Sequence, residues 1–173
     1  MSLQVHRTRL VHAPIAPTWA AVSKMDAVAD WHPNVARASV LTHNAGVDAS
    51  RRVEFHDGTS VVETVMQQDE ARSVTMALLE APLLKKAIVT IRTEKKSAAE
   101  TEVTFSVDYD VKYGPIGWLM GTVLMKKAFR KIFGVSLGGL AYHLETGNLV
   151  TDSVPARASQ GSVDTPDTQD AGR

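Results

Sequence analysis

The sequence predicts an α+β fold in which an antiparallel sheet packs against one long C-terminal helix. Three observations predict it. Seven segments of strand length are separated by short turn signals, two short helical segments stand between the first and second of them, and a long amphipathic helix follows the last. Short connections favour antiparallel pairing, because parallel strands need long crossover connections.

The first strand and the two short helices come first along the chain. Residues 3–12 alternate imperfectly because Arg7 and Arg9 fall on the apolar parity, which indicates either a bulge or an edge position. Residues 13–25 and 26–31 predict the two helices from their apolar spacing.

Six further strands follow, separated by turn signals such as HNAG and HDG. We expect them at residues 35–43, 51–56, 60–67, 73–79, 87–93 and 101–111.

A long amphipathic helix is predicted over residues 115–146. Gly134, Gly138 and Gly139 each weaken a helix, so we expect a bend in its middle. Its apolar residues gather on one side, namely Trp118, Met125, Phe129, Ile132, Phe133, Leu140 and Leu144.

The start of this helix is apolar on all sides, because Ile116, Met120, Val123 and Leu124 point away from that stripe. We expect the loop at residues 78–87 to cover this surface. A second subunit or a transient contact with a membrane are the alternatives. The chain is therefore expected to be a monomer or a homodimer.

The composition is that of a soluble globular protein. Its residues are 44% hydrophobic and 22% charged. The length of 173 residues suits one domain with some residues outside it. The 19 basic and 19 acidic residues cancel, so we expect no nucleic-acid partner. The absence of cysteine excludes disulfides, thiolate metal sites and thiol nucleophiles.

Both ends of the chain carry information about its organisation. The start, MSLQVHRTRL, lacks the apolar segment of a secretory signal, so we expect a cytoplasmic protein. The longest apolar run, residues 114–125, is too short to span a bilayer. Residues 147–173 are rich in Ser, Thr, Asp, Pro and Gly, which predicts a disordered tail after a domain of residues 1–146.

The stretches APIAPTWAAVSKMDAVADWHPNV, FHDGTSVVETV and YGPIGWLMGTVL, with this order of elements, resemble the START/Bet v 1-like superfamily (SRPBCC) and its bacterial polyketide cyclase/dehydrase branch. The resemblance covers residues 3–146. It implies a helix-grip fold, in which a curved seven-stranded antiparallel sheet closes around the C-terminal helix and leaves a cavity. Members include lipid and hormone carriers, aromatic cyclases and hydrolases, so the resemblance implies no single function.

One parity of each strand is expected to face that cavity, and the apolar parity dominates its lining. The expected ligand-binding residues are Trp31, Val53, Phe55, Val61, Glu63, Val65, Phe105, Val107, Tyr109, Trp118, Met125 and Phe129.

Glu63 is the charged residue in this set. It shares parity with Val61 and Val65, so an inward-facing strand places a carboxylate against the ligand as an acid, a base or a hydrogen-bond acceptor. The alternative is that Ser60, Val62, Thr64 and Met66 line the interior and Glu63 is solvated. Both parities carry apolar residues, so periodicity leaves the choice open.

Trp31, His32 and Pro33 form a corner where the short helices lead into the sheet. Pro33 ends the helix, because the residue before proline avoids helical angles. We expect Trp31 to plug the wide end of the fold by packing rather than by stacking on a ligand. We expect His32 to be a surface or capping histidine rather than a catalytic one, and His143 to be a hydrogen-bonded core histidine.

Binding of a small hydrophobic molecule, such as a lipid, an aromatic polyketide or an isoprenoid, is the predicted function. The alternative is a cyclase or dehydratase in which Glu63, His32 or Tyr109 transfers a proton. Tyr109 is expected mainly to pack, with its hydroxyl satisfied at the edge. No histidine has metal-ligand spacing, so neither a metal nor a redox cofactor is expected.

Overall fold

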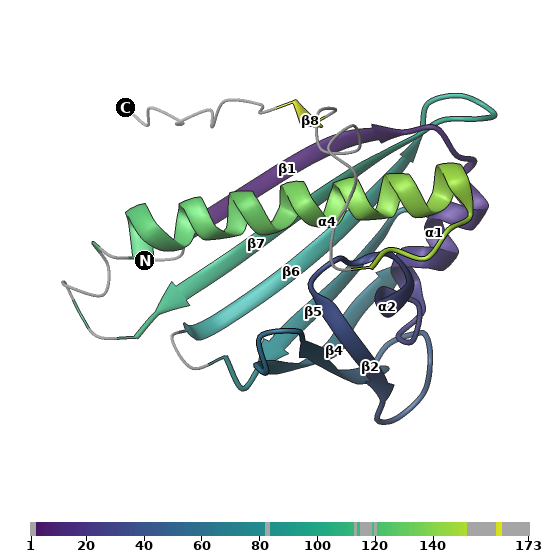
Figure 1. Cartoon of the computed structure of the whole chain (residues 1–173). Coiled ribbons are helices and arrows are strands. Elements are labelled where there is room, and N and C mark those ends of the chain that lie inside the picture. Colours follow the sequence, from purple (N-terminus) through teal and green to yellow (C-terminus); the bar gives the residue numbers. More distant parts are fainter. Residues whose placement is uncertain are drawn as a thin grey trace.

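The fold is built on one curved antiparallel sheet, which a computed structural model shows lying beneath a long helix (Figure 1). The structure describes residues 3–81, 84–112, 114, 119, 121–151 and 162–163. The strand order is β2-β3-β4-β5-β6-β7-β1-β8. The strands are β1 (Leu3–Val11), β2 (Val35–Val40), β3 (Ser50–Phe55), β4 (Ser60–Asp69), β5 (Ser73–Leu79), β6 (Leu84–Lys95), β7 (Thr101–Val111) and β8 (Ser162–Val163).

The helices lie on the concave side of the sheet. Short helices α1 (Ile15–Ser23) and α2 (Val28–Trp31) connect β1 to β2, and a π-helical turn, η1 (Gly121–Met125), leads into α4 (Lys126–Thr146). The long helix packs against β1 and β7 (Figure 1). This arrangement confirms the predicted α+β helix-grip fold.

Strand pairing extends one strand beyond the bounds that its apolar periodicity predicts. The strand predicted over residues 87–93 extends over Leu84–Lys95 in β6, because it pairs with β7 from Leu84 opposite Val111 to Lys95 opposite Thr101. Charged residues outside the apolar run are thus held in the strand by ladder hydrogen bonds.

β1 lies next to the end of the strand order, with the two-residue β8 beyond it. Its pairing with β7 is continuous from Leu3 to Val11, so it contains no bulge there. The two arginines on its apolar parity lie under α4, where Arg7 Nη1 donates to the Arg130 carbonyl at 3.0 Å and Arg9 is 8% exposed.

The first residues after α4 form hydrogen bonds with the rest of the fold. Gly147 ends the helix with a φ of 73°, and its N–H donates to the His143 carbonyl. Val150 is 8% exposed and donates its N–H to the Asp30 carbonyl at 2.9 Å. His143 is half-buried at this helix end rather than in the core, and its Nδ1 lies 2.8 Å from the Asn148 carbonyl oxygen.

The seven predicted strands, β1 to β7, are all present, and a two-residue strand from the tail is added to them. Ser162 and Val163 form β8, which pairs antiparallel with Arg9 and Thr8 at the β1 edge. Residues 152–161 and 164–173 lie outside the described residues, so disorder of the rest of the tail stays a prediction.

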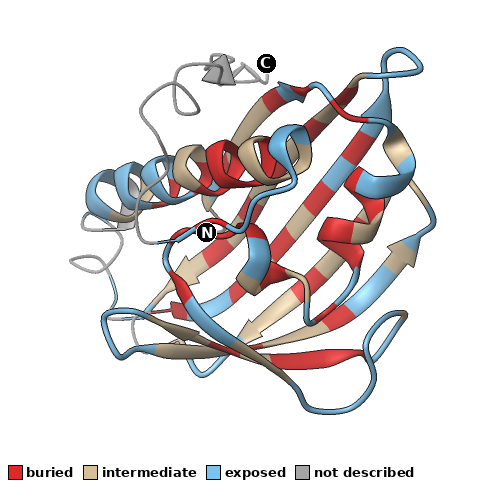
Figure 2. Cartoon of the chain, turned by 45° about the vertical axis from the view of Figure 1, so that its right-hand side comes forward, coloured by how far each residue is buried: buried red, intermediate tan, exposed pale blue. Residues whose placement is uncertain are grey.

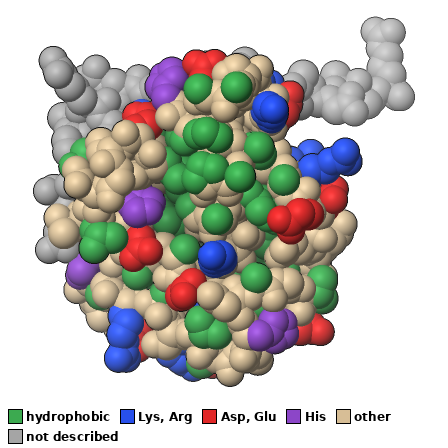
Figure 3. All heavy atoms as spheres, turned by 90° about the vertical axis from the view of Figure 1, so that its right-hand side faces the viewer, with side chains coloured by type: hydrophobic (Ala, Val, Ile, Leu, Met, Phe, Trp, Pro, Cys, Tyr) green, Lys and Arg blue, Asp and Glu red, His purple; other side chains and the backbone are tan. Residues whose placement is uncertain are grey.

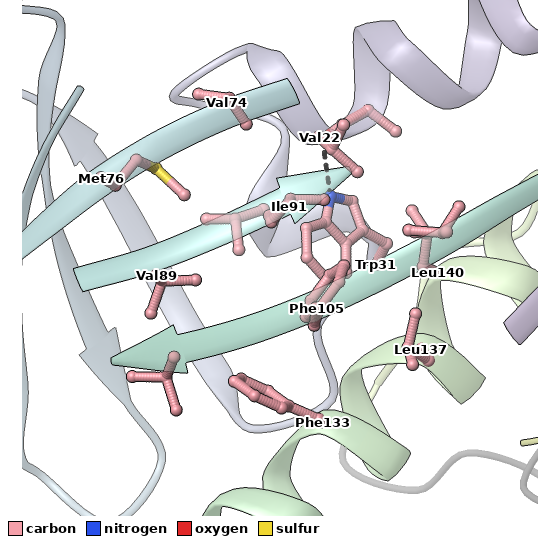
Figure 4. Packing of buried hydrophobic residues seen from close by; sticks show 14 of the residues in the cluster. Val22, Trp31, Val74, Met76, Val89, Ile91, Phe105, Phe133, Leu137 and Leu140 are labelled. Carbon is pink, nitrogen blue, oxygen red and sulfur yellow. Dashed lines mark hydrogen bonds between the residues drawn. The ribbon is translucent and has the colours of Figure 1, made fainter. Parts of the chain in front are cut away.

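Buried residues line the face of the sheet that α4 covers and the side of α4 that faces it (Figure 2). Trp31 is central to this core: it is 2% exposed, and its indole Nε1 donates to the Ala21 carbonyl at 2.9 Å. Its ring meets Phe105 edge-on at 6.0 Å, and it belongs to the same core cluster as Ile91 and Leu140 (Figure 4). The corner tryptophan therefore packs, as expected.

The glycines of α4 let neighbouring residues approach the helix backbone closely, and they do not bend the helix. The helix is unbroken across them and runs without a visible kink (Figure 1). A Cβ added at Gly139 would lie 2.2 Å from the Trp31 carbonyl oxygen and 2.8 Å from Pro33 Cδ. At Gly134 the nearest atom would be Arg7 Nη1 at 2.3 Å, the end of a flexible side chain.

The apolar start of the helix is not covered as expected. Val123 and Leu124 are 61% and 57% exposed, so the described part of the loop at residues 78–87 does not shield them. Ile116 and Met120 lie outside the described residues. Within the described part of the chain, no helix is long and apolar enough to cross a membrane. A second subunit or a transient membrane contact stays a prediction for this surface.

Substituting Gly139→Ala should destabilise the protein by about 2 kcal/mol, because the new methyl group meets backbone and a proline ring that cannot move independently. The matched control is Gly134→Ala, where a flexible arginine yields and helix propensity improves, so its stability should stay within about 1 kcal/mol of wild type. Urea unfolding measures both. Equal stability of the two variants would contradict the close approach at Gly139.

Candidate functional site

A cavity of about 740 Å³ lies between the sheet, the corner after α2 and the helix α4. Its wall includes residues of β3, β4, β5 and β6 on one side and Phe129, Phe133 and Ser136 of α4 on the other. The C-terminal half of α4 packs tightly on the sheet, since Leu137, Leu140 and Ala141 are 0% exposed. The hollow therefore opens under the N-terminal half of the helix.

Aromatic rings give the cavity an apolar wall. Phe105 meets Phe133 edge-on at 5.8 Å, and Phe133 lies 6.0 Å from Phe129. The Phe105–Phe133 contact is edge-to-face, a geometry that aromatic pairs favour over face-to-face stacking, and the Phe129–Phe133 pair is tilted. Figure 4 shows Phe105 and Phe133 side by side where the sheet and α4 meet.

Seven of the predicted ligand-binding residues line this cavity, namely Trp31, Val53, Phe55, Val61, Glu63, Phe105 and Phe129. Val65, Val107, Tyr109 and Met125 are not among the described lining residues. The sheet positions among these four are buried in packing contacts instead: Val65 and Val107 are 0% exposed, and the Tyr109 ring lies 4.9 Å from Phe129. Trp118 lies outside the described residues.

The structure decides the open question about β4. Glu63 lies inside with Val61, and Met66 on the opposite parity is 54% exposed. Glu63 pairs across the strands with Arg51 of β3, whose Nε donates to Glu63 Oε2 at 2.6 Å. Arg51 Nη2 lies 2.5 Å from the same oxygen. The alternative interpretation, in which Glu63 is solvated, is therefore wrong.

This ion pair is buried unequally. The Arg51 side chain is 4% exposed and donates a further hydrogen bond from Nη1 to the Met25 carbonyl at 3.1 Å. The Glu63 side chain keeps 15% of its surface exposed, and its hydrogen bonds within the described chain involve Oε2. Glu63 and Arg51 both line the cavity as one charge-compensated pair.

Sequence reasoning missed Arg51 and Ser136. Arg51 shares parity with Val53 and Phe55, so the signal was an arginine on the inward face of a strand. Ser136 lies three residues after Phe133 and four before Leu140, a polar position within the apolar stripe of the helix.

The corner histidine was expected to be a surface or a capping residue; it is buried rather than at the surface, and it is the C-cap residue of α2. His32 is 8% exposed and lines the cavity. Its Nδ1 accepts the Asn34 N–H at 3.2 Å, so the ring proton is on Nε2. His32 Nε2–H donates to Ser136 Oγ at 2.8 Å, and this hydroxyl donates to the Ile132 carbonyl at 2.7 Å. Burial lowers the pKa of His32 to about 4, so the ring is neutral at pH 7.

The three candidate proton-transfer groups do not form one catalytic cluster. Glu63 and His32 both line the cavity, but each nitrogen of His32 already has a hydrogen-bond partner. Tyr109 is 1% exposed away from the lining, and burial raises the pKa of its hydroxyl. Among the residues described, no group of three His, Asp or Glu side chains is placed to hold a metal ion.

The surface around α1 shows no field of one sign. In the view toward α1 and the C-terminal end of α4, hydrophobic side chains gather in the upper middle of the face, and acidic, basic and histidine side chains are interspersed around them (Figure 3). Such a mixed surface does not favour a polyanion on this face.

Comparisons with known proteins agree with this architecture. A family model described as polyketide cyclase / dehydrase and lipid transport matches residues 2–145. A START superfamily protein from Mycobacterium smegmatis has a TM-score of 0.69 at 18% identity, over 84% of this chain and 99% of its own. A search of curated proteins finds no match.

Two further solved structures share the fold. The Zhui aromatase/cyclase from Streptomyces sp. R1128 has a TM-score of 0.63 at 17% identity, over 87% of this chain and 100% of its own. Ginseng major latex-like protein 151 from Panax ginseng has a TM-score of 0.55 at 15% identity, over 76% of this chain and 96% of its own. At these identities the likeness establishes the fold alone, and it confirms the resemblance predicted from the sequence.

Removing one partner of the buried ion pair should be costly. Arg51→Met leaves the Glu63 carboxylate without its cation and should lower the free energy of unfolding by about 3 kcal/mol. The double variant Arg51→Met/Glu63→Leu should recover most of this loss, because well-packed apolar residues can replace a buried pair at little cost. Chemical denaturation of the wild type, both single variants and the double variant gives the coupling. Additive effects would show that the pair is not energetically coupled.

Stability should depend on pH through His32. Its pKa lies near 4 in the folded protein and near 6.5 in the unfolded chain, so the unfolded state binds the proton first as pH falls. The contribution is complete above pH 6.5 and should decline by about 3 kcal/mol toward pH 4. The stability difference between wild type and His32→Gln, measured by urea unfolding at each pH, isolates this contribution. A difference independent of pH would contradict the burial of a neutral ring.

Proposed function

The chain belongs to the polyketide cyclase/dehydrase and lipid transport family, and we propose that it binds a small hydrophobic molecule in the cavity between its sheet and α4. The proposed ligand classes are lipids, aromatic polyketides and isoprenoids. The protein is expected to work without a metal or redox cofactor and in the cytoplasm.

The observation that carries the proposal is the cavity itself. Its volume of about 740 Å³ is within the range of small-molecule sites, which span roughly 300–1,000 Å³. Its wall combines phenylalanine and valine side chains with few polar groups, as such sites do. A wall of this kind favours an apolar guest, because burial of apolar surface supplies the affinity.

A cyclase or dehydratase activity is the second candidate. Two observations favour it: the fold is shared with an aromatase/cyclase, and Glu63 and His32 line one cavity. Proton transfer, however, needs a group that is free to gain or lose a proton. His32 is held as a neutral ring by Asn34 and Ser136, and Glu63 is paired with Arg51. These contacts favour binding over catalysis.

Nile red, a neutral apolar dye without hydrogen-bond donors, tests the proposal directly. The wild type should bind it with a rise in fluorescence, and Val89→Phe should weaken binding at least about tenfold, because the added ring occupies the cavity. The matched control is Arg92→Phe, which adds the same ring to an exposed position of β6 and should leave affinity unchanged. Native mass spectrometry of the purified protein would identify a ligand carried from the cell.

Two results would count against the proposal. If the wild type fails to bind Nile red, the cavity does not accept an apolar guest. If Val89→Phe and Arg92→Phe have the same effect, the dye binds somewhere else.

A further inference from the structure

We propose that the outer edge of β1 binds one further strand, and that this strand is the acidic C-terminal segment of the same chain, residues 162–170. The pairing of β8 with β1 is the described start of this contact (Figure 1). None of the described residues that line the cavity belongs to β1, so the inference does not rest on the proposed function. Composition alone predicts disorder for residues 164–170, whereas the inference predicts that they dock.

The two edges of β1 are paired differently. One edge pairs with β7 along the whole strand, without a shift of register. At the other edge, the pairs within the described part of the chain are those of Thr8 and Arg9 with β8. A strand edge presents backbone N–H and C=O groups that can pair with another segment. The outer edge of β1 can therefore accept a longer strand than the two residues of β8.

The opposite end of the sheet is protected in another way. β2 is the edge strand there, and its register with β3 shifts between Val35 and Arg37. The exposed Arg37 side chain also carries a charge, which is paired with Glu54 of the neighbouring strand. Bulges and charged side chains are two ways in which proteins keep a sheet edge from pairing with another strand. β1 pairs with β7 without such a shift, so a covering segment serves this purpose at its edge.

The register of β8 places an aspartate opposite an arginine. Ser162 lies opposite Arg9 and Val163 opposite Thr8, in antiparallel pairing. The same register, continued by one residue, sets Asp164 opposite Arg7. Residues directly opposite each other on antiparallel strands point to the same face of the sheet, and opposite charges in such a pair are stabilising. Asp164 would thus lie on the side of Arg7 that faces α4.

This pairing directs the segment toward the N-terminal half of α4. Arg7 donates to the Arg130 carbonyl, whereas His12, further along β1, donates its N–H to the Glu145 side chain. β1 and α4 therefore run in the same direction. A segment antiparallel to β1 moves back along α4, from its C-terminal end toward its start. β8 already contacts α4 at the beginning of this path.

The charges of the segment and of the helix are complementary. Residues 164–170 read DTPDTQD, with three aspartates and no basic residue. Residues 126–144 of α4 contain no acidic residue, and Lys127, Arg130 and Lys131 are exposed. Pro166 lacks a backbone N–H, so ladder pairing ends near it, and the aspartates beyond it act by charge.

Paired cysteines measure the docking, since the chain has no cysteine of its own. His6→Cys/Thr165→Cys joins two positions that this register sets directly opposite each other, near the spacing that a disulfide spans. The matched control, His6→Cys/Gln169→Cys, moves the second cysteine further along the tail. The measured quantity is the effective concentration of the two thiols within one chain, at equilibrium against glutathione. It should be at least about tenfold higher for the first pair, whereas an undocked tail gives similar values, because loop closure depends weakly on length.

Charge reversal at position 164 tests the register. Asp164→Lys, added to His6→Cys/Thr165→Cys, sets a like charge opposite Arg7 and should lower the effective concentration at least about threefold. The matched control is Asp152→Lys, which makes the same change of charge before β8 and should have no effect. About 0.5 M NaCl should reduce the difference between the two variants, because salt screens exposed charges.

Three results would overturn the inference. Equal effective concentrations for the two cysteine pairs show that the segment does not dock. Disulfides that form mainly between chains show that the β1 edge pairs with a second copy instead. Equal effects of Asp164→Lys and Asp152→Lys show that Asp164 does not lie opposite Arg7.

A second cysteine pair keeps the test decisive if His6→Cys prevents folding. Thr8→Cys/Val163→Cys follows the same register at a described pair, with Thr8→Cys/Gln169→Cys as its control, and the same tenfold difference is expected. Equal values for these two pairs would overturn the inference in the same way. Nile red binding tests the proposed function separately, whatever the outcome here.

Discussion

The close approach of α4 to the corner after α2 is the constraint on which the rest of the structure depends. At Gly139 the helix backbone lies so near Trp31 and Pro33 that a single methyl group has no room. Three residues earlier, Ser136 binds the His32 ring. Both contacts fix the C-terminal half of the helix against the sheet. Residues of the other half, such as Phe129 and Phe133, line the cavity together with residues of β3, β4 and β5.

The hydrogen bonds of the polar groups inside this fold are mainly structural rather than catalytic. His32 serves as a link between the corner and α4, and its hydrogen bonds select one neutral tautomer. Arg51 links β3 to the backbone at Met25 while it neutralises Glu63. The buried His32 ring and the Arg51 guanidinium are both hydrogen-bonded by their neighbours, as buried polar groups usually are in stable folds. The rest of the wall is mostly apolar, with a few polar residues such as Asn34, His56 and Asp57.

The family shares a fold, and the side chains that line the cavity differ from one protein to another. Proteins that share the fold include an aromatase/cyclase and a START superfamily protein, so the scaffold itself does not specify a reaction. Function depends on which side chains a given chain directs inward. Here the lining is mostly aromatic and aliphatic, and its charged side chains are the Arg51–Glu63 pair and Asp57 among the described residues. Small-molecule sites commonly combine an apolar wall with a few polar groups.

The sequence by itself determined the elements and their order, because alternation and helical spacing are local properties of the chain. It placed β5 and β7 at their observed bounds and identified Phe105 and Phe129 as lining residues. Only the tertiary structure decided that Glu63 faces inward, since both parities of β4 are apolar and the partner comes from register with β3. The burial of His32 likewise depends on Ser136, 104 residues away, a contact that no local pattern encodes.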